Sequence, residues 1–514
     1  MKIIFRYIVP FTIDDSRYDE VVDKLSTTGG MDITADGKTY SWKSSNPNTG
    51  IPFSIINEGK TEIMSCVTHS ISVDRNTAIG SVHELYSNEK YETDNNKEEY
   101  IPYSKKLIFQ LERINYKFTL SEAKLLLFRT GIGFLCYDVE FENEITAKTA
   151  EEFQSKFRIL LLKSKLAEYR ERQKQIPGTK DKEIYENLDG KPGEAFCIGD
   201  LVTNLFTAIG TDFSIWPIGS NIKGNSKAIL YTYICTRSKP QSTIDLPYTA
   251  AESDEYKRYL SIIRGIKASY NDSSGSSIKP FEHISWITYY EGSGVIATPE
   301  ECDDNNINFC ESKLPELFKT DYFMIYILAL YQSYSALHLS ARIADELPVN
   351  TGAFTDENEI NNLSEKLEII ENKINVFLLK SSFATVSHIN QHNDYYDLCK
   401  KVLRIDSDVK SLSDGVSPLA KMQRIRIDAQ NEEKEKERSR REMLIRILLT
   451  VFGLASILTD AVSFIYGFYE CDAVKSNISL IVLAVVGAVF LIALACYFGE
   501  ALLKLFKKKK RKKK

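Results

Sequence analysis

The 514-residue sequence lacks most of the motifs that mark enzymes and metalloproteins. Its nine cysteines are scattered, odd in number and without a CxxC pair, so they predict neither a disulfide framework nor a zinc motif. No GxGxxG, P-loop, GxSxG or HExxH motif is present. We therefore expect no enzymatic activity and no resident cofactor, and we assign no metal ligand.

The composition is close to the globular average, with 43% hydrophobic and 26% charged residues. It excludes a disordered chain, a collagen and a transporter with many membrane spans. The net charge of −5 conceals a basic C-terminal end, because Lys504 and all of Lys507–Lys514 are basic while the remainder is acidic. The position of this basic end beside the apolar stretches predicts contact with anionic lipid. It has no interleaved aromatic residues of the kind that stack on bases. Direct binding of nucleic acid is not expected.

Two long apolar stretches near the C-terminus form the strongest pattern. They are Met443–Tyr469 and Ile478–Phe498, joined by a short connector, Glu470–Asn477. Each reaches the roughly 20 residues that a helix needs to cross a bilayer. Basic residues flank both outer ends, and excess Lys and Arg mark the cytoplasmic side. We therefore expect a transmembrane hairpin in the inner or plasma membrane, with both termini cytoplasmic and the lipid bilayer as a partner.

The first of these stretches carries a polar stripe. Its members are spaced by three or four residues, which places them on one helical face: Gly453, Ser456, Asp460, Ser463 and Gly467. An ionisable residue in a span costs roughly 2.5–3.5 kcal/mol and normally faces a bundle interior. Because one hairpin has no interior, the stripe predicts a homo-oligomer. It either lines a cation-selective pore, with an Asp460 ring, or only packs helices together.

The rest of the chain is predicted in two parts. Residues 1–315 read as an α+β cytosolic domain, and residues 316–442 as a helical stalk that leads into the hairpin (443–503) and the basic tail (504–514). The expected strands are Lys2–Val9, Leu125–Phe141, Ala228–Cys235 and His283–Tyr289, and the expected helices include Ala150–Gln175 and Glu252–Lys267. In the stalk, Leu363, Leu367, Ile370, Ile374 and Phe377 recur at heptad-like spacing, which predicts a buried seam.

This arrangement resembles the CorA-like family of two-transmembrane divalent-cation channels. That family carries Gly-Met-Asn after a Tyr at the outer end of its first span. Here Tyr466 and Gly467 match, whereas Phe468 replaces Met and the Asn is absent. The resemblance implies a homo-oligomer, typically a pentamer, with a divalent cation as the permeant ion. In that family the Asn helps to form the selectivity ring, so the resemblance does not imply magnesium selectivity for this chain.

The expected function is therefore an oligomeric membrane channel for cations, gated by its large cytosolic domain. Enlarged CorA-like proteins accompany type III CRISPR systems, where they resemble antiviral effectors opened by a nucleotide second messenger, so a nucleotide-type ligand is one expected partner. Two alternatives remain open. One is a housekeeping divalent-metal transporter, and the other is a membrane-tethered sensor or scaffold without a pore.

Overall fold

The computed structural model describes most of the N-terminal body and one long C-terminal helix. The described residues are 1–28, 33–35, 38–44, 61–65, 67, 71, 78–92, 98–111, 114–142, 144–159, 165–169, 185–186, 214–215, 227–236, 254–266, 275–299, 304–346, 357–381, 383–469 and 487. They belong to two compact units, Met1–Leu419 and Ala420–Lys514.

The strands of the first unit form one mixed sheet. Their bounds are β1 Lys2–Thr12, β2 Ile33–Ala35, β3 Lys38–Ser44, β4 Gly80–Glu92, β5 Glu98–Pro102, β6 Ser104–Leu111, β7 Ile114–Phe128, β8 Ile132–Phe141, β9 Lys165–Tyr169, β10 Tyr185–Glu186, β11 Ser214–Ile215, β12 Ile229–Cys235, β13 Ser276–Phe281, β14 Ile284–Tyr289 and β15 Gly292–Ala297. The main path through the sheet is β10-β9-β6-β7-β8-β1-β12-β15-β14-β13. The strands β2 to β5 extend it beside β7, and β11 pairs with β1.

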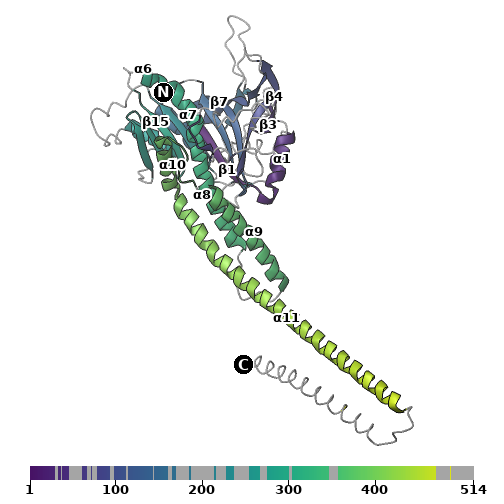
Figure 1. Cartoon of the computed structure of the whole chain (residues 1–514). Helices are drawn as coiled ribbons and strands as arrows, with labels where there is room; N and C mark the ends of the chain where they lie inside the picture. Colours follow the sequence, from purple (N-terminus) through teal and green to yellow (C-terminus); the bar gives the residue numbers. More distant parts are fainter. Residues whose placement is uncertain are drawn as a thin grey trace, which may run out of the picture. The chain divides into compact units, whose positions relative to one another are not determined.

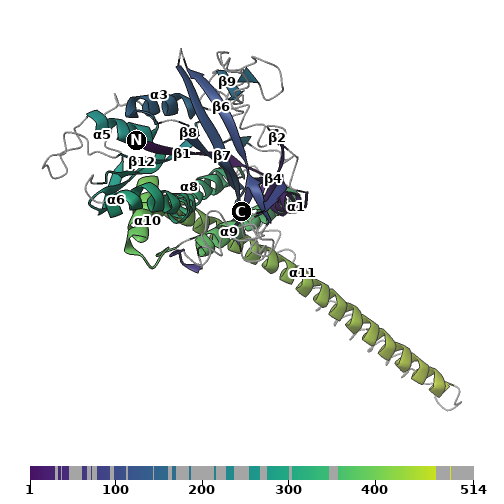
Figure 2. The same cartoon turned by 90° about the horizontal axis from the view of Figure 1, so that it is seen from above.

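The helices flank this sheet or follow it in the chain. Their bounds are η1 Asp15–Arg17, α1 Tyr18–Thr28, α3 Ala147–Phe157, α5 Asp254–Arg264, α6 Asp304–Asn308, the π-helical turn η4 Phe309–Lys313, α7 Leu314–Lys319, α8 Asp321–Glu346, α9 Glu357–Ser381, α10 Asn390–Leu403 and α11 Ile405–Tyr469. Helices α3 and α5 cover one face of the sheet, and α8 and α10 cover the other (Figure 1 and Figure 2).

The central strand β1 explains why both faces are covered. Its alternate residues Phe5 and Tyr7 enter the core beneath α3 and α5, while Ile4 and Ile8 enter the core shared with α8 and α10. Successive side chains of a strand point to opposite faces, so a nearly continuous apolar run needs a layer on each side. The single charged residue within this run, Arg6, lies on the α8 face.

Several sequence predictions match individual elements. Strand β1 spans the expected Lys2–Val9, and the expected run Leu125–Phe141 divides into the end of β7 and all of β8. The turn between them needs Gly131, whose φ is +83°. The expected helix Ala150–Gln175 is wrong in its second half, because α3 ends at Phe157 and β9 follows.

Helix α8 is the centre of the larger core. All residues from Tyr322 to Tyr331 are at most 5% exposed, because the sheet, α9 and α10 surround them. The expected seam of α9 is confirmed at Ile370, Ile374 and Phe377, which are all buried.

The expected transmembrane hairpin is a prediction that the structure corrects. Within the described ranges, no helix is both long and apolar enough to cross a membrane. The first expected span, Met443–Tyr469, is the end of α11, where Ser456, Thr459 and Asp460 interrupt the apolar residues. The second expected span lies outside the described residues apart from Gly487.

This correction extends to every prediction that depended on the hairpin. Over the residues that the structure describes, the fold is a large mixed sheet with helices, and the expected membrane hairpin is not found there. The assignments to the membrane, to transmembrane ion transport and to an inner- or plasma-membrane location are wrong on the same ground.

Candidate ligand-binding site

A cavity of about 680 Å³ opens where α10 turns into α11. Its size falls within the range of small-molecule sites. The lining residues come from β13, the turn after β14, α8, α10 and the first turn of α11: Gly275, Ser276, Tyr290, Leu337, Lys401, Val402, Leu403, Arg404 and Asp408. We call this cavity the junction pocket.

The junction itself is a single residue, Arg404. Its backbone is left-handed, with φ 56° and ψ 30°, and it closes α10 by donating its N–H to the carbonyl of Lys400. The carbonyl of Arg404 accepts from the N–H of Asp408 at 3.0 Å, which begins α11. Glycine is the usual residue in this conformation, and a non-glycine residue there is strained. The strain lies directly at the junction pocket.

The charges of the junction pocket are unbalanced. Among the described lining residues, Lys401 and Arg404 contribute two exposed cations, and Asp408 contributes the one carboxylate. Within the described part of the chain, neither Lys401 nor Arg404 forms an ion pair within 4 Å. Burial raises the pKa of Asp408, and the charge of Arg404 opposes that rise. The pocket therefore retains cationic N–H groups that a bound anion could engage.

An aromatic ring completes the junction pocket. Tyr290 lies in the turn between β14 and β15 and is 53% exposed. Burial of its hydroxyl, with the negative charge of Asp408, raises the pKa of Tyr290, so it stays a neutral phenol. A half-exposed ring beside two cations suits a ligand that carries both an aromatic group and a negative charge.

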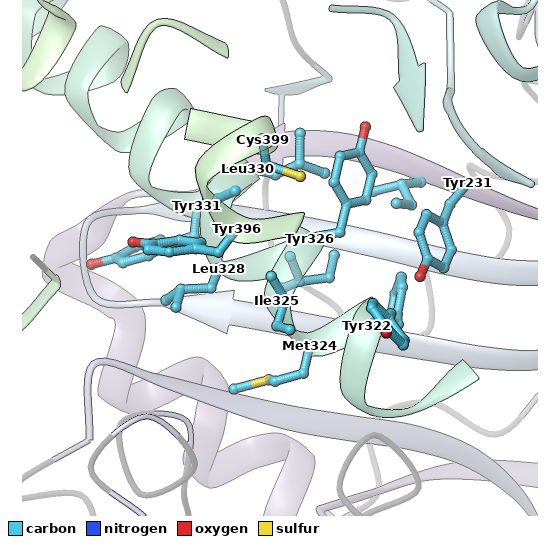
Figure 3. Packing of buried hydrophobic residues seen from close by; sticks show 14 of the residues in the cluster. Tyr231, Tyr322, Met324, Ile325, Tyr326, Leu328, Leu330, Tyr331, Tyr396 and Cys399 are labelled. Carbon is cyan, nitrogen blue, oxygen red and sulfur yellow. The ribbon is translucent and has the colours of Figure 1, made fainter. Parts of the chain in front are cut away.

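The wall of the junction pocket is held by a rigid aromatic layer between α8 and α10. Tyr396 and the side-chain amide of Gln332 hydrogen-bond at 2.8–2.9 Å across the two helices. On the sheet side, the Tyr395 and Ser293 hydroxyls lie 2.8 Å apart. Figure 3 shows Tyr326, Tyr396 and Cys399 packed within this layer. Helix α10 is therefore fixed to the body up to the residue where α11 begins.

A second cluster of charges lies at the other end of α8, and here every charge is matched. Arg6 donates from Nε and Nη2 to both oxygens of Asp138, at 2.6 and 2.9 Å, and from Nη2 to Glu122 at 3.0 Å. Its Nη1 donates to the carbonyl of Lys319 at 3.1 Å. The ring of Phe323 lies 4.2 Å from the Arg6 guanidinium. We call these residues, with Lys124 and Glu140, the buried charge network.

Lysines complete the buried charge network. The Lys319 ammonium donates to Glu122 and to Glu140, each at 2.9 Å, and Lys124 donates to Glu122 at 3.0 Å. Burial acts to raise the pKa of Glu122, but the charges of Lys124, Arg6 and Lys319 outweigh it and hold the pKa well below its usual range. With its charges paired, this cluster fastens the start of α8 to the sheet and offers no free group to a ligand.

The residues singled out in the sequence lie elsewhere. Gly453, Ser456, Asp460 and Ser463 are exposed along α11 in the second unit. Tyr466, Gly467 and Phe468 belong to the same helix, but their side chains are outside the described set. The role of this stripe stays a prediction.

The histidines that the structure describes lie apart from one another or in the core. His392 is a core residue, with its Nδ1 3.0 Å from the Ser387 hydroxyl and its ring edge-on to Tyr322. Among the residues that the structure describes, no group of three His, Cys, Asp or Glu side chains is placed to hold a metal ion.

Sequence reasoning missed the junction pocket entirely. Its polar residues are far apart in the chain, and a left-handed arginine leaves no pattern in the sequence because glycine or asparagine usually marks such a position. The segment containing Lys400, Lys401 and Arg404 reads as an ordinary basic helix end.

No protein-family model, curated protein or solved structure matches the chain. The CorA-like resemblance and the pentamer therefore stay predictions from the sequence.

Proposed function

We propose that this protein is a ligand-responsive sensor whose junction pocket binds a small anionic, aromatic ligand of the nucleotide type. One observation supports the proposal above the others: the cavity lies against Arg404, the only residue between α10 and α11. A ligand that binds there touches both helices at once. A ligand shifts a conformational equilibrium only by its differential affinity for the two states, and a strained one-residue link is a place where two states can differ.

The output of the proposed sensor is helix α11. It begins at the junction pocket with Ile405 and continues as one helix to Tyr469. Large apolar side chains along its second half are 48–68% exposed: Met443, Leu444, Ile445, Leu448, Leu449, Phe452, Ile457 and Phe464. Contiguous exposed apolar surface of this kind marks an interaction site. We propose that copies of this chain associate through α11 and that ligand binding adjusts this association.

Calorimetric titration with three probes tests the binding step. ATP carries both an aromatic base and phosphates, adenosine carries the base alone, and inorganic phosphate carries the charge alone. We expect ATP to bind more tightly than either part. Arg404→Gln should weaken ATP binding about tenfold or more, because a hydrogen bond to a charged group contributes about 1.5–3 kcal/mol.

Three further variants make this titration specific. Lys401→Gln should weaken ATP and phosphate together, whereas Tyr290→Ala should weaken ATP and adenosine. Lys410→Gln removes an exposed cation of α11 outside the pocket lining and should change nothing. Equal affinity for ATP in the wild type and in Arg404→Gln, or no binding of any of the probes, would contradict the proposal.

A further inference from the structure

Helix α9 has an apolar face that no part of the described chain covers. Its inner face, with Ile370, Ile374 and Phe377, is at most 3% exposed. On the outer side, Ile369 is 48%, Val376 49% and Leu379 83% exposed. At 100° per residue, the two sets lie on nearly opposite sides of the helix. One side therefore belongs to the core of the chain, and the other remains available.

The outer face has the spacing of a coiled-coil seam. Ile369, Asn372, Val376 and Leu379 follow one another at three, four and three residues, which are the a, d, a and d positions of a heptad. β-Branched residues at a with leucine at d favour two parallel strands. Asn372 is an exposed polar residue in the seam, and a shifted register would bury it without a hydrogen-bond partner against an apolar side chain, which costs free energy.

The charges that flank the seam favour one relative orientation of two paired α9 helices. The e positions are Lys366, Lys373 and Lys380, and the g positions beside the seam are Glu368 and Asn375. Parallel helices pair g with e of the partner, which brings Glu368 to Lys373 and Asn375 to Lys380. Antiparallel helices pair e with e and would bring lysine to lysine. The face is therefore complementary to itself in the parallel orientation only.

Lys373 has a partner within its own chain. The Lys373 ammonium donates to Asp15 at 2.6 Å. An ammonium has three N–H donors, so a second carboxylate can approach it without breaking the first contact. The internal contact also holds Lys373 in place, which lowers the entropy cost of a pair across the interface.

We propose that the outer face of α9 packs in parallel against the same face of a second copy of this chain. This inference rests on the proposed self-association and names a surface for it within the first unit. The seam has only four residues, so the area that it buries is well below the roughly 800 Å² per partner of a stable interface. It therefore acts together with α11 and does not hold two copies by itself.

Cysteine cross-linking in the full chain tests the seam. Val376→Cys and Leu379→Cys each place a thiol at an a or d position, so in a parallel pair each should join to its own counterpart under mild oxidation. Glu371→Cys, a half-buried position of α9 off the seam, and the wild-type chain are the controls and should give no new dimer. Adding Glu368→Lys to Val376→Cys should slow cross-linking about threefold, because it replaces an attractive pair with a repulsive one.

A mixed experiment tests the orientation. Ile369→Cys and Leu379→Cys chains are combined, and the linked peptides are identified by mass spectrometry. The parallel pair predicts only 369–369 and 379–379 links, whereas 369–379 links would overturn it. Light scattering on the same samples separates the two proposals: oligomers without seam cross-links overturn the α9 contact alone, and a monomer overturns the contact and the self-association together.

Discussion

The two charge clusters along α8 differ in one property, which is whether their charges are paired. At the start of the helix, Arg6 is fully buried and donates hydrogen bonds to Asp138, Glu122 and the carbonyl of Lys319. At the junction pocket, Lys401 and Arg404 are exposed, and Asp408 is the one carboxylate among the lining residues that the structure describes. The same residue types therefore serve structure in one place and offer binding groups in the other. Pairing, more than the number of charges, separates a structural cluster from a candidate site.

The largest expected effect comes from breaking the paired cluster. Asp138→Asn keeps the shape of the side chain but removes the charge that faces Arg6. Removing one partner of a buried ion pair leaves an uncompensated charge, so we expect the free energy of unfolding to fall by about 3–5 kcal/mol. Urea unfolding followed by circular dichroism measures the change.

A matched variant controls for the loss of a carboxylate. Glu140 belongs to the same network, but its side chain is 46% exposed. Glu140→Gln should therefore cost less than about 1 kcal/mol. If Asp138→Asn is no more destabilising than Glu140→Gln, the buried charge network does not fasten α8.

Lowering the pH should affect the buried charge network and the buried histidines of α8 and α10 differently. Burial lowers the pKa of His338 and of His392 to about 4. In the unfolded chain an imidazole titrates near 6.5. Between these values the unfolded chain binds more protons, so stability is lost as the pH falls from about 6.5 towards 4. Each histidine should cost about 2 kcal/mol at pH 5 relative to pH 7.

The matched pair for this effect is His392→Gln and His388→Gln. The first variant removes one buried imidazole and should reduce the slope of stability against pH between 6.5 and 5, while His338 continues to contribute. The second replaces an exposed histidine of the same segment and should leave the slope unchanged. The low pKa of Glu122 predicts that its ion pairs persist through this window, so an equal slope in His392→Gln and the wild type would mean that other groups cause the acid sensitivity.

The sequence could predict what depends on local pattern. Alternation and apolar runs placed β1, β12 and β14, and the heptad-like spacing placed the buried seam of α9. It could not predict the partner of Arg6, because Asp138 is 132 residues away and becomes its neighbour only when β1 pairs with β8. The junction pocket has the same origin, since Tyr290 and Arg404 meet only through the packing of α10 on the sheet.

The apolar end of α11 shows the opposite error. There the pattern was strong, and it led to a transmembrane hairpin that the described structure does not contain. A long apolar run indicates that a surface is buried against something, but it does not identify whether lipid, another chain or the same chain buries it. The spacing of the polar stripe from Gly453 to Gly467 likewise does not identify what the stripe contacts.

Hydrogen exchange at the α10–α11 junction tests the central claim most directly. Amide exchange is measured by mass spectrometry for the wild type and for Arg404→Gln, each without ATP and with ATP at the concentration that half-saturates the wild type. The account predicts that ATP slows exchange in the peptide spanning Leu403 to Val409 of the wild type and has little effect there in Arg404→Gln, which binds ATP about tenfold more weakly. Unchanged exchange at the junction despite ATP binding, or the same protection in both proteins, would contradict the claim that the junction pocket controls α11.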